Sequence, residues 1–390
     1  MPRGAYRTEA SSPEREVKHL LVVGASGVIG SAVVEYACRL PGWQVHALSR
    51  RPPDLDPEAQ YERIVLDLTR PAECEEALRQ LKARVTHLVY AAVSETPGLV
   101  AGWTDSALMQ RNLEMLQNVL RPLSGSPSLR HVVLMQGTKA YGAHLHPIAL
   151  PAIEDAPRDA HQNFYWLQED FLRETSAQEG WSWTVLRPQI VLGGACGVAM
   201  NPTPVIGAYA AICREEGSAC GFPGAHVAIW EAVDARLVAQ ACIWAFEQPH
   251  ARNEIFNITN GDVWVPGHQW AAICGILGVP VGPPAPVDFS RFALEKSQVW
   301  DRIARRNGLR RIGLAELFGE SHHYFNLLMC NGQPAAPWPP ALVSTIKIRQ
   351  AGFAPCLSTF ESLRYWLGRL ARRGSLPAAP PQPTHPEHVA

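Results

Sequence analysis

The sequence predicts an α/β fold in which helices cover both faces of a doubly wound parallel sheet. Two observations lead to this fold. Through the first half of the chain, short and largely apolar segments alternate with longer segments of helical pattern. A glycine-rich loop directly follows the first apolar segment and opens the first helix. Nearly continuous apolar strands are typical of parallel sheets because crossover helices bury them on both sides.

Six strands are expected in this half, each of them short and rich in Val, Leu or Ile. They are 19–24, 43–49, 63–68, 86–92, 131–136 and 183–188. Helices are expected between them over 28–40, 71–82, 105–121 and 164–179. Asn163 directly precedes the last of these helices and is a favoured capping residue, so it marks where that helix begins.

The pattern loosens beyond residue 190, with helices expected over 204–217, 233–247, 267–278 and 292–307 and short strands such as 254–259. We therefore expect a cofactor-binding domain over 18–190 whose sheet is completed by later segments. A smaller, mostly helical substrate-binding region follows over 191–372. Residues 1–17 are polar and residues 373–390 are rich in proline, so both are expected to be flexible or disordered tails.

The composition predicts a soluble cytoplasmic protein. With a net charge of −1, the chain has no basic excess for nucleic acid or an anionic membrane surface. The nine cysteines include no C-x-x-C pair, as expected of reduced thiols in the cytoplasm. The N-terminal segment lacks the apolar core of a signal peptide. No apolar run approaches the roughly 18 residues that a membrane-spanning helix needs.

The glycine-rich loop GASGVIG, residues 24–30, is a candidate nucleotide-binding site. Glycines there allow a tight turn and a close approach to a pyrophosphate, which then lies at the helix N-terminus. The spacing G-x-x-G-x-x-G differs from the usual G-x-G-x-x-G, but its place between strand and helix predicts a Rossmann-type domain. The expected cofactor contacts in this loop are Gly24, Ser26, Gly27, Val28, Ile29 and Gly30.

The end of the second strand predicts which nucleotide binds. Proteins that bind NAD usually place an acidic residue there to accept from the ribose hydroxyl. This chain has Ser49, Arg50 and Arg51 instead, and paired guanidinium groups suit a 2′-phosphate. NADPH (or NADP+) is therefore the expected cofactor. Asp67 and Leu68, at the end of the third strand, are expected to lie beside the adenine.

Two segments could perform chemistry. Strand 131–136 runs into GTKAYG, residues 137–142, so Lys139 is expected at the carboxyl end of the sheet, where the nicotinamide would lie. The segment NFYWLQED, residues 163–170, places Tyr165 in the first turn of a helix. Many nicotinamide-dependent reductases use such a tyrosine with a lysine one turn later. Here that position holds Glu169, whose charge is opposite.

Together these motifs resemble the extended short-chain dehydrogenases/reductases, and more closely the progesterone 5β-reductase and iridoid synthase group. That group has a lysine in a G-x-K-x-Y loop, which Gly137, Lys139 and Tyr141 match. It also has N-F-Y followed by E-D, as in residues 163–170. WSWTVLRP, GAYAAICREEG and NEIFNITNGDVW extend the resemblance over about residues 19–310. The departures are Trp166, where the group usually has a second tyrosine, a proline-rich stretch over 144–157, and the tails.

The resemblance implies a catalytic pair of Tyr165 and Lys139, both of which would also contact the cofactor. It places Gly137 where carbonyl reductases and sugar-nucleotide epimerases have a serine that binds the carbonyl, and Glu169 where they have the lysine. Further cofactor contacts are expected at Ala91, Ala92, Gln136, Pro188 and Ile190. Tyr141, Leu145 and Met200 are candidates for the substrate pocket, although core packing is an equal alternative for each.

The implied function is NADPH-dependent reduction of a C=C bond conjugated with a carbonyl, in a small hydrophobic substrate. A carbonyl reductase or a sugar-nucleotide epimerase or dehydratase on the same fold is one alternative. A non-catalytic NADP(H)-sensing regulator is another, and it would need neither Tyr165 nor Lys139. His144 and His146 have no third ligand at a suitable spacing, so no metal site is expected. The resemblance is compatible with a monomer or a homodimer.

Overall fold

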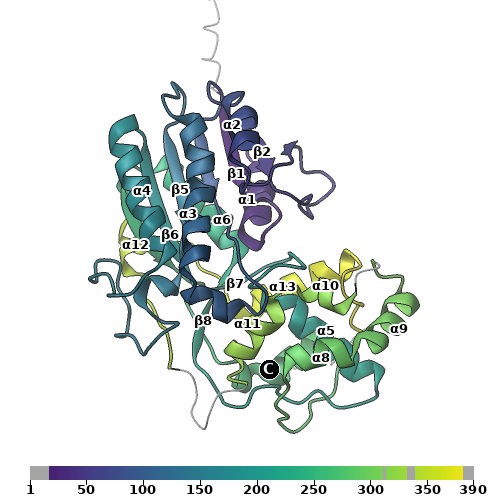
Figure 1. Cartoon of the computed structure of the whole chain (residues 1–390). Coiled ribbons are helices and arrows are strands. Elements are labelled where there is room, and N and C mark those ends of the chain that lie inside the picture. The colour runs from purple at the N-terminus through teal and green to yellow at the C-terminus, as the bar shows by residue number, and fades with distance from the viewer. Residues whose placement is uncertain (1–16, 311–312, 332–338, 381–390) are drawn as a thin grey trace, which may run out of the picture.

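The computed structural model describes residues 17–310, 313–331 and 339–380 (Figure 1). Its centre is a seven-stranded parallel sheet in the order β3-β2-β1-β4-β5-β6-β9. The strands are β1 (Lys18–Val23), β2 (Trp43–Leu48), β3 (Glu62–Ile64), β4 (His87–Tyr90), β5 (His131–Met135), β6 (Ser182–Pro188) and β9 (Glu254–Ile258). This is the strand order of a doubly wound dinucleotide-binding fold, so the predicted fold class is confirmed.

Helices cover both faces of this sheet, and alternate residues of one strand show how. In β1, Leu20 and Val22 belong to the same core as helices α1 (Val28–Cys38) and α6 (Ala235–Glu247). Leu21 and Val23 belong to the opposite core, with α2 (Pro71–Arg79), α3 (Ser106–Leu120) and α4 (Phe164–Glu179). Because successive side chains of a strand point to opposite faces, all four are buried and the strand is apolar throughout.

The seventh strand comes from far along the chain. β9 pairs with β6 in parallel register from Thr184 opposite Glu254 to Pro188 opposite Ile258. Between these two strands the chain forms β7 (Ile190–Leu192), helix α5 (Pro202–Glu215), β8 (Trp230–Asp234) and helix α6. The sheet that holds the cofactor loop is thus finished only after the chain has entered the second region.

The second region is mostly helical and lies at the carboxyl ends of the strands, as Figure 1 shows. A small sheet of order β10-β8-β7, with β10 (Val263–Trp264), joins it to the large one. The later helices are α7 (Pro266–Leu277), α8 (Phe289–Glu295), α9 (Ser297–Asn307), α10 (Leu314–Phe318), α11 (Ser321–Leu328), α12 (Ile346–Gln350) and α13 (Thr359–Arg372). Short 3-10 turns are η1 (Leu99–Thr104), η2 (Arg121–Leu123), η3 (Thr138–Tyr141) and η4 (Pro249–Ala251).

Two predicted elements differ from the structure. The third strand ends at Ile64 rather than at 68, because β3 is an edge strand and Asp67 instead forms a turn by accepting from the Thr69 N–H and hydroxyl. The helix expected over 292–307 is two helices, α8 and α9. They meet at Lys296, whose φ of −99° and ψ of 5° leave the helical region.

Part of the segment that was expected to be a C-terminal tail is buried in the fold. Of the segment that was expected to be a C-terminal tail, residues 373–380 are described, and there Ser375 and Leu376 are buried. The predicted N-terminal tail, apart from residue 17, lies outside the described residues, as does the end of the chain from 381. Among the described helices, none is both long and apolar enough to span a membrane.

Candidate active site

A single cavity lies where the sheet meets the second region, at the carboxyl ends of β1, β4, β5 and β6. Its walls come from the glycine-rich loop, the ends of β4 and β5, the start of α4 and helix α11. The sequence-predicted residues that line it are Gly27, Val28, Ile29, Ala91, Ala92, Gln136, Lys139, Tyr165, Pro188, Ile190 and Met200. The fold therefore brings the predicted cofactor loop and both predicted catalytic residues to one place.

Tyr165 reaches this cavity because Asn163 fixes the start of α4. The Asn163 side chain accepts from the Tyr165 N–H at 3.0 Å, which caps the helix. Its amide also donates to the Lys139 carbonyl at 2.7 Å, which ties the helix to the loop after β5. Burial, followed by the negative charge of Glu95, raises the pKa of Tyr165, so its hydroxyl stays protonated and can donate.

Lys139 lies in the same wall with its ammonium group buried among aromatic rings. Its Nζ is 4.6 Å from the ring centroid of Trp103, 5.4 Å from that of Phe164 and 5.8 Å from that of Tyr165. Glu95 Oε1 is 3.6 Å from the same Nζ. Burial lowers the pKa of Lys139, and the Glu95 carboxylate opposes this effect. The cavity wall beside Tyr165 thus holds a desolvated lysine.

Gly137 faces the tyrosine. A Cβ atom placed on Gly137 would lie 3.4 Å from the Tyr165 hydroxyl oxygen and 3.4 Å from the Pro188 carbonyl oxygen. Its φ of −178° is extended backbone that any residue adopts, so the backbone conformation does not require glycine. This is the position at which the resemblance predicted a missing serine, and a side chain there would point at the tyrosine.

Glu169 does not point into the cavity. Its carboxylate accepts from Arg158 at 2.9 Å, from Arg173 at 3.1 Å and from Gln136 at 3.1 Å, and it lies 3.4 Å from Arg187. Burial opposes ionisation, but the bonds from Arg158 and Gln136 and the charge of Arg187 hold its pKa below the usual range. The carboxylate therefore ties α4 to β5 and β6.

Tyr141, a candidate for the substrate pocket, and Trp166, a departure from the resembled group, both lie with this charged cluster. Trp166 packs against the guanidinium groups of Arg158 and Arg187, at 4.8 and 5.8 Å from its ring centroid. Tyr141 donates to the Asn257 side chain at 2.7 Å and accepts from Arg187 at 3.1 Å. Neither lines the cavity, because both side chains are engaged on the Arg187 side of α4.

Of the two remaining candidate substrate contacts, one lines the cavity and the other does not. Met200 lines the cavity, whereas Leu145 is 41% exposed and stands outside it. His144 lines the cavity next to Lys139, and His146 forms an ion pair with Asp159 at 2.8 Å. Within the described residues, no three His, Cys, Asp or Glu side chains gather in a way that could hold a metal ion.

The glycine-rich loop has the shape that a pyrophosphate needs. Gly24 has a φ of +86°, and a Cβ on it would lie 2.8 Å from the Ala91 carbonyl carbon. A Cβ on Gly30 would collide with the Gly24 backbone, so helix and strand pack too closely for any side chain. No side chain caps the helix at Gly27, which leaves the first N–H groups of α1 for a ligand. These features fit a nicotinamide dinucleotide.

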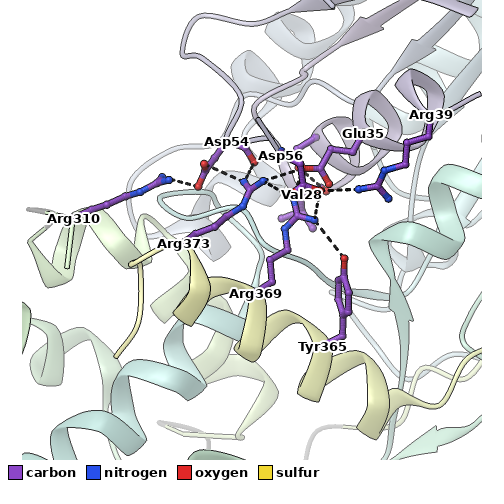
Figure 2. Close-up of polar contacts among 10 residues, drawn as sticks. Val28, Glu35, Arg39, Asp54, Asp56, Arg310, Tyr365, Arg369 and Arg373 are labelled. Atoms are coloured by element: carbon purple, nitrogen blue, oxygen red, sulfur yellow. Dashed lines mark hydrogen bonds and ion pairs between the residues drawn. The ribbon is translucent and has the colours of Figure 1, made fainter. Parts of the chain in front are cut away.

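The loop after β2 carries the predicted phosphate-binding arginines, and two of its acidic residues, Asp54 and Asp56, pair with Arg310 and Arg373. Arg50 and Arg51 are exposed, and Arg51 donates to the Gly197 carbonyl at 2.9 Å. Figure 2 shows Asp54 and Asp56 paired with other arginines: Arg310 is 2.8 Å from Asp54, and Arg373 is 2.8 Å from Asp56. The carboxylates of Asp54 and Asp56 are thus paired, whereas Arg50 and Arg51 are exposed.

The same cluster joins the cofactor helix to the last helix. Glu35 of α1 accepts from Arg369 of α13, and Arg373 lies 3.2 Å from the same oxygen (Figure 2). Arg369 also lies 3.3 Å from Asp56. Ser49, predicted as a cofactor contact, donates to the Arg51 carbonyl at 2.7 Å and so shapes this loop.

Some cavity residues were not found from the sequence. Trp103 comes from the segment after β4, and Tyr324, Leu327 and Leu328 come from helix α11; Glu95, which also follows β4, lies beside Lys139. The position of Glu95, a lone acid soon after an apolar strand, was a signal that could have been used. The α11 residues gave none, since only the tertiary fold brings them to the strand ends.

Comparisons with known proteins agree with this architecture. A family model described as the PRISE-like Rossmann-fold domain matches residues 20–333. An (S)-8-oxocitronellyl enol synthase of Nepeta cataria is 33% identical over 332 residues, which cover 79% of this chain and 82% of that protein. A 3-oxo-Delta(4,5)-steroid 5-beta-reductase of Arabidopsis thaliana is 32% identical, with coverage of 76% and 79%. Among solved structures, a UDP-glucose 4-epimerase of Thermotoga maritima has a TM-score of 0.63 at 17% identity, covering 91% of this chain and 99% of that one. This last likeness is one of fold.

Proposed function

Since the chain belongs to the PRISE-like Rossmann-fold family, we propose that it is an NADPH-dependent reductase of C=C bonds conjugated with a carbonyl group. The chain is an oxidoreductase of the short-chain dehydrogenase/reductase type. The names of its relatives, a steroid 5-beta-reductase and enol synthases, favour chemistry at a conjugated double bond.

The relation between Tyr165 and Gly137 carries this proposal. Tyr165 lines the cavity, and a Cβ atom on Gly137, in the loop after β5, would lie 3.4 Å from its hydroxyl oxygen. A carbonyl bound there would meet the Tyr165 hydroxyl but no serine hydroxyl at position 137. The tyrosine donor polarises the carbonyl oxygen and leaves the conjugated β-carbon as the electrophilic centre.

The residues of the wall then act on the charge that develops. When bound, NADPH supplies a hydride to the β-carbon of the substrate. The negative charge moves to the carbonyl oxygen as an enolate, and the Tyr165 hydroxyl donates a hydrogen bond to that oxygen. Lys139, desolvated in the same wall, makes the site electropositive. Solvent protonates the α-carbon, so the C=C bond gains one hydride and one proton while the carbonyl is retained.

The choice of NADPH over NADH rests on the loop after β2. Arg50 and Arg51 replace the acidic residue that a ribose hydroxyl would need. The nearby carboxylates of Asp54 and Asp56 are already paired with arginines, so they oppose a 2′-phosphate less. A small hydrophobic carbonyl compound fits the walls, to which Met200 and Leu328 contribute apolar surface.

A product analysis tests the proposal. Purified protein is incubated with NADPH and small enals, cyclic enones or a 3-oxo-Δ4 steroid, and the products are identified by mass spectrometry. We expect the saturated carbonyl compound. Allylic alcohols with the double bond intact would contradict the assignment and favour a carbonyl reductase. Binding of NADPH without turnover of any substrate would favour a cofactor-sensing regulator.

A further inference from the structure

Glu95 is a buried carboxylate that the proposed reaction does not yet use. It follows β4, and its side chain is 6% exposed. Its Oε1 atom accepts no hydrogen bond and lies 3.6 Å from Lys139 Nζ. Trp103 completes the arrangement, with its ring 4.6 Å from the same nitrogen. The Lys139 ammonium group thus lies close to three aromatic rings and to one carboxylate, that of Glu95.

Neither charge would be stable at this place without the other. Burial raises the pKa of Glu95, and Lys139 opposes that effect. Burial lowers the pKa of Lys139, and Glu95 opposes that effect in turn. Among the described residues, Glu95 is the only carboxylate within ion-pair distance of Lys139. An isolated buried ammonium loses its proton unless an opposite charge is close.

The other ionisable groups around the pair cannot take this role. On the lysine side are Tyr165 and His144, and burial lowers the pKa of His144 to about 4, so it is neutral at neutral pH. On the Glu95 side is Glu320, which accepts from the Gly98 N–H at 2.9 Å and repels Glu95. Tyr324 of α11 faces Tyr165 and carries no charge at neutral pH.

We propose that Glu95 is a positioning residue of the active site, whose carboxylate keeps Lys139 protonated and holds its ammonium group in the cavity wall beside Tyr165. This inference rests on the proposed function in one respect, since the value of a protonated Lys139 is the stabilisation of an enolate. The contact itself is independent of the substrate.

The pH profile of turnover tests the pair. Removing the charge with Glu95→Gln should lower the pKa of Lys139, so the alkaline limb of kcat should move to lower pH by about 1–3 units. Glu95→Asp should give an intermediate profile. Glu154→Gln is the matched control, because Glu154 is also buried and accepts from the Asn257 N–H at 2.8 Å, away from the cavity. Its alkaline limb should not move, and an unmoved limb in Glu95→Gln would overturn the proposal.

A double-variant cycle separates action through Lys139 from general damage. If Glu95 acts through Lys139, Glu95→Gln should change kcat no further in a Lys139→Met background. Independent, additive losses would contradict the proposal even if both proteins fold and bind NADPH normally.

A stability measurement tests the interaction between Glu95 and Lys139 without any substrate. The free energy of unfolding of wild type and of Glu95→Gln is measured by urea titration at about pH 7 and again at about pH 9. The unfolded lysine keeps its proton over this range, whereas the folded Lys139 of the variant loses it earlier. Stability should therefore rise with pH more steeply in the variant than in wild type. Equal slopes would overturn the Glu95 assignment, while absent enone turnover with unequal slopes would overturn only the proposed function.

Discussion

The Glu169 carboxylate lies 3.4 Å from the guanidinium group of Arg187, and the two side chains are only 3% and 4% exposed. The position that holds a catalytic lysine in many related reductases is here part of a buried charge cluster. Its charge matches its surroundings, since Arg158 and Arg173 also bind it. The glutamate is a structural element of the site, and the cation proposed to act in the reaction, Lys139, comes from the loop after β5.

Restoring the lysine should therefore harm the protein. Glu169→Lys would place a fourth cation among three arginines, and breaking a buried ion pair costs about 3–5 kcal/mol. We expect a loss of this size in urea unfolding and no gain of activity. Glu174→Lys, on an exposed part of the same helix, is the control and should change stability by less than about 0.5 kcal/mol. A stable and more active Glu169→Lys enzyme would refute the structural role.

Tyr165→Phe should separate chemistry from folding. The phenol oxygen contacts no hydrogen-bond partner in the described part of the chain, so its removal should leave the thermal midpoint nearly unchanged. Loss of the Tyr165 donor to the enolate oxygen should lower kcat by about 10²–10³-fold, with the NADPH dissociation constant unaltered. Steady-state kinetics and fluorescence titration measure both, and unchanged turnover would remove Tyr165 from the mechanism.

Gly137→Ser tests whether the lack of a hydroxyl group at position 137 directs reduction to the C=C bond. The extended backbone accepts a side chain, and the new Cβ would meet the Tyr165 hydroxyl at 3.4 Å. A second hydroxyl donor there should raise the fraction of allylic alcohol among the products. Gly137→Ala adds the same Cβ without the hydroxyl and should not, so equal product ratios in the two variants would count against this reasoning.

Arg50 and Arg51 should set the cofactor preference. Replacing both with alanine removes charge-assisted bonds worth about 1.5–3 kcal/mol each, so NADPH should bind at least about tenfold more weakly. NADH binding should change little. Arg63→Ala, an exposed arginine in β3, serves as the control. An equal rise in the NADPH and NADH dissociation constants would show that the two arginines do not bind the 2′-phosphate.

The charge cluster between α1 and α13 should make the stability of the protein depend on pH in the acid range. The pKa of Asp56 lies below its usual range because Arg373, Arg369 and Arg39 outweigh its burial. A carboxyl with a depressed pKa contributes stability above its unfolded pKa and loses it as pH falls. The unfolding free energy of wild type should therefore drop as the pH falls below about 5, through the unfolded pKa of an aspartate at about 4 and towards the lowered pKa of Asp56. Arg373→Ala should make that drop shallower, whereas Arg364→Ala, on an exposed site of the same helix, should not.

The sheet could be predicted from the sequence because the residues of a strand that is buried on both faces are nearly all apolar. Leu20 to Val23 are all fully buried, and an apolar run is the direct result. The glycine-rich loop and the Asn163 cap before Tyr165 are likewise local sequence patterns. They can be recognised without knowing which distant segments pack against them. The third strand was placed too long because an edge strand has no second partner, and Asp67 found a turn instead.

The site was harder to predict wherever its contacts are distant in sequence. Tyr141 was a candidate for the substrate pocket because it lies close to Lys139 in the chain. The side chains of Tyr141 and Trp166 instead contact Arg187, which only the pairing of β5 with β6 brings close. Helix α11 supplies cavity residues more than 100 positions after Tyr165 through tertiary packing alone, and no pattern in the chain marks it.

The pairing of β6 with β9 also constrains how the protein can be made. When the ribosome has released residue 188, the edge of β6 has no neighbour, and its partner strand is still about 70 residues from being synthesised. An exposed strand edge readily pairs with another chain. Nascent chains are thus most prone to association during this interval. A gene fragment that stops at residue 190 would keep that edge open permanently and should be recovered mainly as aggregate.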